Sequence, residues 1–123
     1  SPMIHAYNEQ FLDIIQRKVS VMFEFAVLEE HIEIDAFAQK FVTSPVSRAL
    51  ETADLVYSLG KSANELLALI SNKEPLNIET GSYASPEYWV GWVLAYAQWC
   101  FNKSYAAIIA AVPCSTILGH YFP

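Results

Sequence analysis

The chain has 123 residues with a net charge of −6, and 54% of its residues are hydrophobic while only 16% are charged. This length is typical of one domain, and the composition excludes a disordered chain, which would be polar and rich in charge. The acidic balance gives the electrostatic attraction to phosphates the wrong sign, so nucleic acid is not an expected partner.

The N-terminus begins Ser1-Pro2-Met3, without the basic and apolar regions of a secretory signal peptide. Met3 fits a natural start with two extra residues before it. The chain has only two cysteines, Cys100 and Cys114, so it lacks the disulfide framework of small secreted domains. We therefore expect a cytoplasmic protein, organised as a single helical domain over residues 1–123.

A first long helix is predicted from about residue 8 to residue 30. Asn8 can cap it, because its side-chain oxygen suits the free amides of a first turn. Apolar residues then recur at three- and four-residue steps along one face: Phe11, Ile15, Val19, Met22 and Ala26. We interpret the acidic run over residues 29–33 as the turn that follows.

Two shorter helices are predicted next. Asp35 is placed to cap a helix that carries Phe37 and Phe41. The pair Ser44-Pro45 then ends that helix and starts another, because serine is a good cap and proline is favoured at the first helical position.

A capping box predicts the next helix. Ser62 is followed three residues later by Glu65, and each side chain of such a pair satisfies a backbone amide of the other residue. The helix should end near residues 71–72. Residues 73–84 show no sustained period of hydrophobic residues, and Pro75, Gly81 and Ser82 indicate a loop.

The strongest signal is an aromatic-rich helix predicted over residues 86–102. Ser85-Pro86-Glu87 supplies a cap, a first-turn proline and an acidic group at the positive end of the helix. Ser104 can cap a further helix through residue 111, and Pro113 and Ser115 indicate a last turn. Alternating strand patterns are scarce, so the prediction is an all-α fold: a compact bundle of five to six helices around the Trp/Tyr-rich helix.

The aromatic helix has two apolar stripes. One is formed by Trp89, Trp92, Tyr96 and Trp99, and the adjoining one by Tyr88, Val93, Ala97 and Cys100. We favour a central core helix over a ligand or partner site, although tryptophan and tyrosine are the residues most enriched at binding hot spots. The apolar stretch of residues 88–101 is too short to span a bilayer, so no membrane partner is expected.

No constellation of catalytic or metal-binding residues is complete. Gly60-Lys61-Ser62 lacks the preceding glycine and strand of a phosphate-binding loop. The three histidines are not spaced as ligands on one helical face, and the acidic residues near His31 lack the glycine and alternating donors of a calcium loop. Cys100 lies in an apolar helical run, and no residue near Cys114 in the sequence supplies a base. We therefore expect no metal and no cofactor, and an enzyme is disfavoured.

Two segments resemble a family of uncharacterised bacterial helical proteins. The string SPEYWVGWVLAYAQW, from Ser85 to Trp99, followed by Lys103-Ser104-Tyr105, resembles that family's aromatic motif. An earlier segment resembles another part of the same family, through Glu51, Asp54, Tyr57, Gly60, Ser62 and Glu65-Leu66. The chain has Ala97 where the family usually has tyrosine, which removes one contact from any shared surface.

What the resemblance implies is limited. Similar proteins have no established activity, and they resemble accessory components encoded near toxin-like or mobile-element genes. No catalytic residue is carried over from them. They tend to continue beyond the position of Pro123, so we expect a trimmed or naturally shortened C-terminus.

Three hypotheses for function follow. The leading one is a cytoplasmic interaction or regulatory module, similar to an antitoxin, that binds a protein partner or a second copy through an apolar or aromatic surface. The alternative is a small-molecule-binding or enzymatic domain in which Tyr57, Glu65, Glu87 and Gln98 converge beside the aromatic side chains. The third is a structural domain with an exposed apolar end at Tyr121 and Phe122. The candidate binding or interface residues are Tyr57, Glu65, Glu87, Tyr88, Trp89, Trp92, Tyr96, Gln98 and Trp99.

Overall fold

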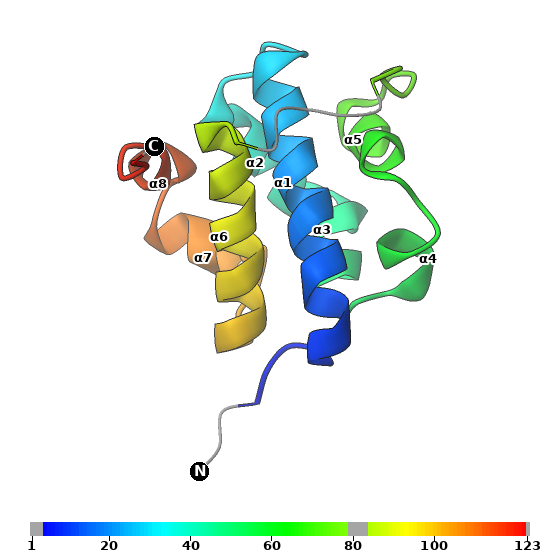
Figure 1. The fold of residues 1–123 in the computed structure, drawn as a ribbon, viewed down its shortest axis with the longest axis vertical. Coiled ribbons are helices and arrows are strands. Elements are labelled where there is room, and N and C mark those ends of the chain that lie inside the picture. The colour runs from blue at the N-terminus through cyan, green and yellow to red at the C-terminus, as the bar shows by residue number, and fades with distance from the viewer. Residues whose placement is uncertain (1–3, 79–83, 123) are drawn as a thin grey trace.

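A computed structural model describes residues 4–78 and 84–122, and every regular element in these two ranges is a helix (Figure 1). One short 3-10 helix precedes eight α-helices: η1 (Glu9–Phe11), α1 (Leu12–Leu28), α2 (Ile34–Thr43), α3 (Pro45–Glu51), α4 (Leu55–Ser58), α5 (Ala63–Ser71), α6 (Pro86–Phe101), α7 (Tyr105–Ala111) and α8 (Cys114–Leu118). The prediction of an all-α bundle is confirmed. The number of helices exceeds the five to six expected, because α4 and α8 are too short to show a helical period of hydrophobic residues in the sequence. Gly81 and Ser82 of the predicted loop lie outside the described residues.

Most predicted caps are present. The Asn8 side chain accepts from the amide of Gln10 at 3.0 Å, so the predicted first helix is η1 followed directly by α1. Ser62 and Glu65 form the complete capping box of α5. Ser104 caps α7 by accepting from the amide of Ala107.

Two predicted helix starts are wrong. The cap of α2 is Glu33, whose carboxylate accepts from the amide of Ala36 at 2.8 Å, and Asp35 lies inside the first turn. The Asp35 carboxylate instead accepts from the amide and hydroxyl of Ser115, which ties α2 to α8. The last helix begins at Cys114, one residue before the predicted start at Ser115.

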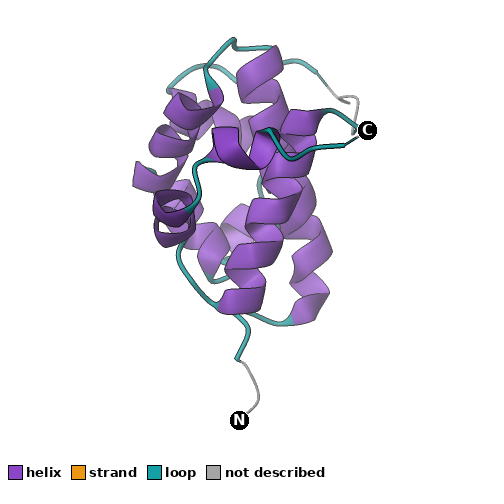
Figure 2. Ribbon diagram, turned by 90° about the vertical axis from the view of Figure 1, so that its left-hand side faces the viewer, coloured by secondary structure: helices purple, strands orange, loops and turns teal. Residues whose placement is uncertain are grey.

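Helix α1 lies at the centre of the bundle. It packs along its length against α6, while α2 and α5 also contact it (Figure 1). Helices α7 and α8 lie on the side of α6 that faces away from α1 (Figure 1), and the view turned by 90° shows only helices and loops among the described residues (Figure 2). The interior is aromatic where α1, α2 and α7 meet, since Phe23 has edge contacts with Phe37 and Phe41, and Tyr105 contacts Phe41.

At their closest point, helices α1 and α6 contact each other through backbone atoms. A Cβ atom placed on Gly91 would lie 2.5 Å from the Cα of Ser20 and 2.8 Å from the carbonyl oxygen of Val19. These are backbone atoms of a long helix, so they cannot rotate away as a side chain can. Glycine at position 91 is therefore required for the observed separation of the two helices.

Gly91→Ala should destabilise the protein by up to about 2 kcal/mol, because overpacking typically costs about 1–3 kcal/mol and the helix propensity gained by alanine returns about 1 kcal/mol. Urea unfolding followed by circular dichroism measures the loss. The control is Gly119→Ala, where the added Cβ lies no closer than 3.5 Å to its neighbours. A Gly91→Ala variant as stable as the Gly119→Ala variant would show that the helices are not in close contact here.

Candidate functional site

Helix α6 begins at a hydrogen-bonded junction with α1. The Ser85 hydroxyl accepts from the amide of Tyr88 at 3.1 Å and donates to the carboxylate of Glu24. Glu24 is on α1 and only 2% exposed. A buried carboxylate is costly unless it accepts hydrogen bonds, so Ser85 both starts α6 and stabilises a charged group of the neighbouring helix.

The inner face of α6 consists mostly of small or aliphatic residues. Its buried residues are Val90, Gly91, Leu94, Ala95, Gln98 and Trp99. Because Gly91 and Ala95 let α1 approach closely, there is no room for large rings beside these two residues. The bulky side chains lie elsewhere on the helix.

The aromatic stripe predicted as core is largely outside it. Trp99 is 5% exposed, but Tyr96 is 50% exposed, and Trp89 and Trp92 are only partly buried. Trp89 packs against the edge of the core. The preference for a sealed aromatic core was therefore wrong for all of the stripe but Trp99, and the stripe forms a face that solvent reaches.

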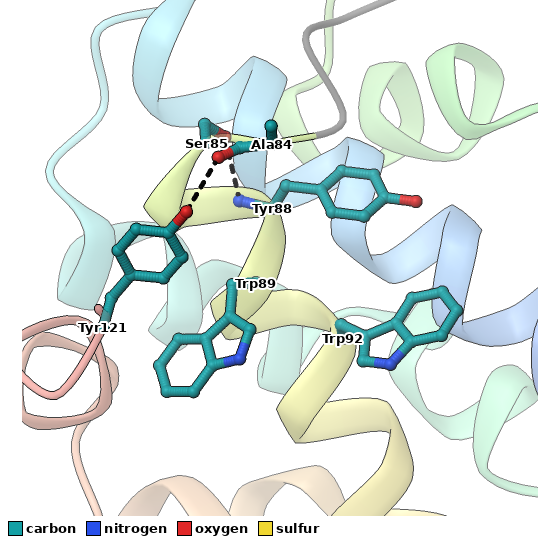
Figure 3. A pocket seen from close by; sticks show the side chains of 6 residues that line it. All are labelled: Ala84, Ser85, Tyr88, Trp89, Trp92 and Tyr121. Atoms are coloured by element: carbon teal, nitrogen blue, oxygen red, sulfur yellow. Dashed lines mark hydrogen bonds between the residues drawn. The ribbon is translucent and has the colours of Figure 1, made fainter. Parts of the chain in front are cut away.

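A shallow aromatic pocket lies at the N-terminal end of this face (Figure 3). Its volume is about 230 Å³, and its lining residues are Ala84, Ser85, Tyr88, Trp89, Trp92 and Tyr121. The rings of Trp89 and Tyr121 meet edge to face at 5.6 Å, and those of Tyr88 and Trp92 stack at 6.4 Å. The Tyr121 hydroxyl donates to the Ala84 carbonyl at 3.1 Å, which holds the C-terminal segment against the start of α6.

The N-terminal segment covers the other end of α6. The Trp99 indole donates to the Tyr7 carbonyl at 2.8 Å, and the His5 ring stacks on Trp99 with centroids 3.9 Å apart. Tyr96, one turn earlier, contacts the edge of this cluster through Trp99. Trp99 is therefore fixed in place, while Tyr96 projects outward.

The remaining candidate residues do not share a site. Tyr57 and Glu65 belong to α4 and α5, which lie across α1 from α6 (Figure 1). Glu65 serves the capping box, and its hydrogen bonds with Ser62 lower the pKa of its carboxyl. Glu87 lies in the first turn of α6, whereas Gln98 points inward and donates to the Glu51 carbonyl at 3.5 Å.

A polar contact joins α3 to α7. Glu51 accepts from the amide of Tyr105 at 2.7 Å, and the Tyr105 hydroxyl has no hydrogen-bond partner among the described residues. Burial raises the pKa of Tyr105 well above its ordinary value, and the neighbouring Tyr7 and Glu51 add to the effect. Burial likewise raises the pKa of the Cys114 thiol to about 12. Such a thiol is almost entirely protonated at neutral pH, so Cys114 is not a nucleophile.

The charge of the chain is distributed unevenly around this site. From Tyr88 to the C-terminus, Lys103 is the only residue with a formal charge when histidine is neutral. Because the whole chain carries −6 and Lys103 contributes +1, the first 87 residues carry −7. This pattern can be read from the sequence, although the periodicity of the aromatic residues does not reveal it.

Tyr121 and Glu24 belong to the site but were not among its predicted residues. Tyr121 was expected only as part of an exposed end, and it packs on Trp89 while Phe122 is 87% exposed. No local sequence signal connects Glu24 to Ser85, because 61 residues separate them.

Over residues 4–78 and 84–122, no helix has the length and apolar character needed to cross a membrane. The same residues contain no group of three or more His, Cys, Asp or Glu side chains placed to hold a metal ion. In comparisons with protein-family models, characterised proteins and solved structures, nothing matches the chain significantly.

Ser85→Ala should cost more stability than Ser104→Ala. Both serines cap a helix with the same geometry, and loss of such a cap costs about 1 kcal/mol. Ser85→Ala also removes a hydrogen bond from a buried carboxylate, which adds roughly 1–3 kcal/mol. Urea denaturation of the two variants gives the difference directly, and equal losses would show that the bond to Glu24 contributes nothing.

Tyr105→Phe should be neutral or stabilising by about 1 kcal/mol at pH 7, because it removes a buried hydroxyl without a partner. A raised folded-state pKa contributes stability that is complete below the unfolded pKa of about 10 and is lost as the pH rises above it. The wild-type protein should therefore lose stability above about pH 9–10, and the variant should lose less. Denaturant midpoints measured from pH 7 to pH 11 test this, and parallel curves would contradict it.

Proposed function

We propose that this chain is a protein–protein interaction module whose docking surface is the outer face of α6. We define this face by Trp89, Trp92, Val93, Tyr96 and Cys100. The observation that carries the proposal is that an entire helix face, rich in tryptophan and tyrosine and without any charged residue, stays partly open to solvent.

The composition of this face is typical of an interface centre. Such centres are depleted in charge and enriched in aromatic residues, and tryptophan and tyrosine account for a large share of measured hot spots. A partner that covers the face would remove apolar surface from water at about 25 cal/mol per Å². The pocket at Trp89 and Trp92 offers a recess for one anchoring side chain.

The arrangement supports binding better than catalysis. The polar residues needed for a reaction beside the aromatic side chains are divided between opposite sides of α1, and the buried Cys114 thiol is held protonated. Within this proposal we infer a regulatory, antitoxin-like role in the cytoplasm, because residues 85–105 resemble accessory proteins encoded near toxin-like genes.

Photo-crosslinking from the α6 face tests the proposal. A benzophenone amino acid replaces Tyr96, and the control carries it at Leu69 on α5, which is almost equally exposed (54% against 50%). Each variant is irradiated as purified protein and also in cells of the natural host. We expect a discrete adduct from position 96 in at least one setting, lost when Trp92→Ala is added, and none from position 69.

The peptides joined in the adduct are identified by mass spectrometry. A single defined contact surface on the joined protein supports the proposal. No adduct from position 96 in either setting, or adducts of equal amount from both positions, would overturn it.

A further inference from the structure

The outer face of α6 has the spacing of a helix–helix seam. Trp89, Val93, Tyr96 and Cys100 follow steps of four, three and four, which is the repeat of the a and d positions in a coiled coil. None of these four side chains is fully buried, and Tyr96 is half exposed. The seam therefore extends over three turns of α6, and Tyr121 contacts it at Trp89.

We propose that a second copy of this chain covers the seam, with the two α6 helices antiparallel about a two-fold axis that passes between Val93 and Tyr96. This inference rests on the interaction function proposed above and names the partner. It also fixes the pairs across the seam: Trp89 faces Cys100 of the second copy, and Val93 faces its Tyr96.

The sizes of the side chains favour the antiparallel direction. In that arrangement each large ring faces a small side chain, so Trp89 lies against Cys100 and Tyr96 lies against Val93. A parallel arrangement would place Trp89 on Trp89 and Tyr96 on Tyr96, with small residues facing each other in the layers between. Interiors pack at high density, and alternating large and small partners fill the layers without voids or clashes.

The charges favour a second copy over a charged partner. Two chains of −6 repel each other when they meet through most of their surfaces, but residues 88–101 of α6 contribute no charge to a contact. Two copies that meet through the α6 face therefore bring no charged side chain of residues 88–101 together, and the face lacks the groups that would select a basic or acidic protein.

The neighbouring helix leaves room for this approach. The exposed side chains of α7 are small, since Ala106, Ala107, Ala110 and Ala111 lie on its surface. A two-fold contact of this kind uses the same surface on both copies, so it closes at a dimer and leaves no free seam for a third chain.

Disulfide trapping between two proteins that each carry one accessible cysteine tests the pairing. Val93→Cys and Tyr96→Cys are made separately, each with Cys100→Ser, and carry tags of different size; Cys114 stays buried and unreactive. The two proteins are mixed and equilibrated in a glutathione redox buffer. We expect the mixed 93–96 disulfide to exceed both same-residue disulfides several-fold, because only the antiparallel register places these positions in one layer.

A Leu69→Cys protein with Cys100→Ser is the control for random collision, since position 69 on α5 is as exposed as position 96. Dominant 93–93 and 96–96 disulfides would overturn the antiparallel arrangement. Crosslinking no greater than that of the Leu69→Cys control would overturn the second copy as partner.

The mass of the unmodified protein provides a second readout. Sedimentation equilibrium should give a species of twice 13.8 kDa at high concentration. Tyr96→Glu should shift it to the monomer, whereas Leu69→Glu, with the same added charge and similar exposure, should not. A wild-type monomer at every concentration, together with an adduct from position 96 to a different protein, would overturn this inference and leave the interaction function standing. A monomer without any such adduct would overturn both.

Discussion

The close contact between α1 and α6 at Gly91 is the constraint on which the rest of the structure depends. A residue with any side chain at this position would push α6 away from the backbone of α1 at Val19 and Ser20. Other contacts use the same short separation: the Gln16 amide donates to the Trp92 carbonyl at 3.2 Å, and Glu24 reaches Ser85 at the start of α6. Each depends on the two helix backbones being nearly in contact.

This constraint also explains why the aromatic side chains lie outside. A helix that approaches its neighbour through glycine and alanine has no space for indole rings beside Gly91 and Ala95, so Trp89, Trp92 and Tyr96 lie elsewhere on α6. The first 87 residues carry the charge that keeps the rest of the surface solvated, and residues from Tyr88 onward carry almost none. The order of residues along α6 thus places small side chains toward α1 and uncharged aromatic side chains on the outer face. We assign this outer face to a partner.

The sequence predicts what is decided locally. The caps at Ser62, Ser85 and Ser104 are correct because their bonds span only three residues. Asp35 has the right chemistry for a cap, but a distant residue, Ser115, takes its carboxylate. The same limit applies to the aromatic stripe: helical spacing shows which residues share a face, but whether the face is inside depends on what packs against the opposite side. The contact of Tyr121 with Trp89 likewise requires the fold of the whole chain.

Fluorescence of a protein that retains only Trp92, with Trp89→Phe and Trp99→Phe, tests the central claim most directly. The account places this indole on the partly open face of α6. In dilute protein its emission should be red-shifted and readily quenched by acrylamide, and both should change toward a buried indole as the concentration rises and the face is covered. Emission that is blue-shifted and protected from quencher at every concentration would contradict the account, because it would place the aromatic stripe inside the core.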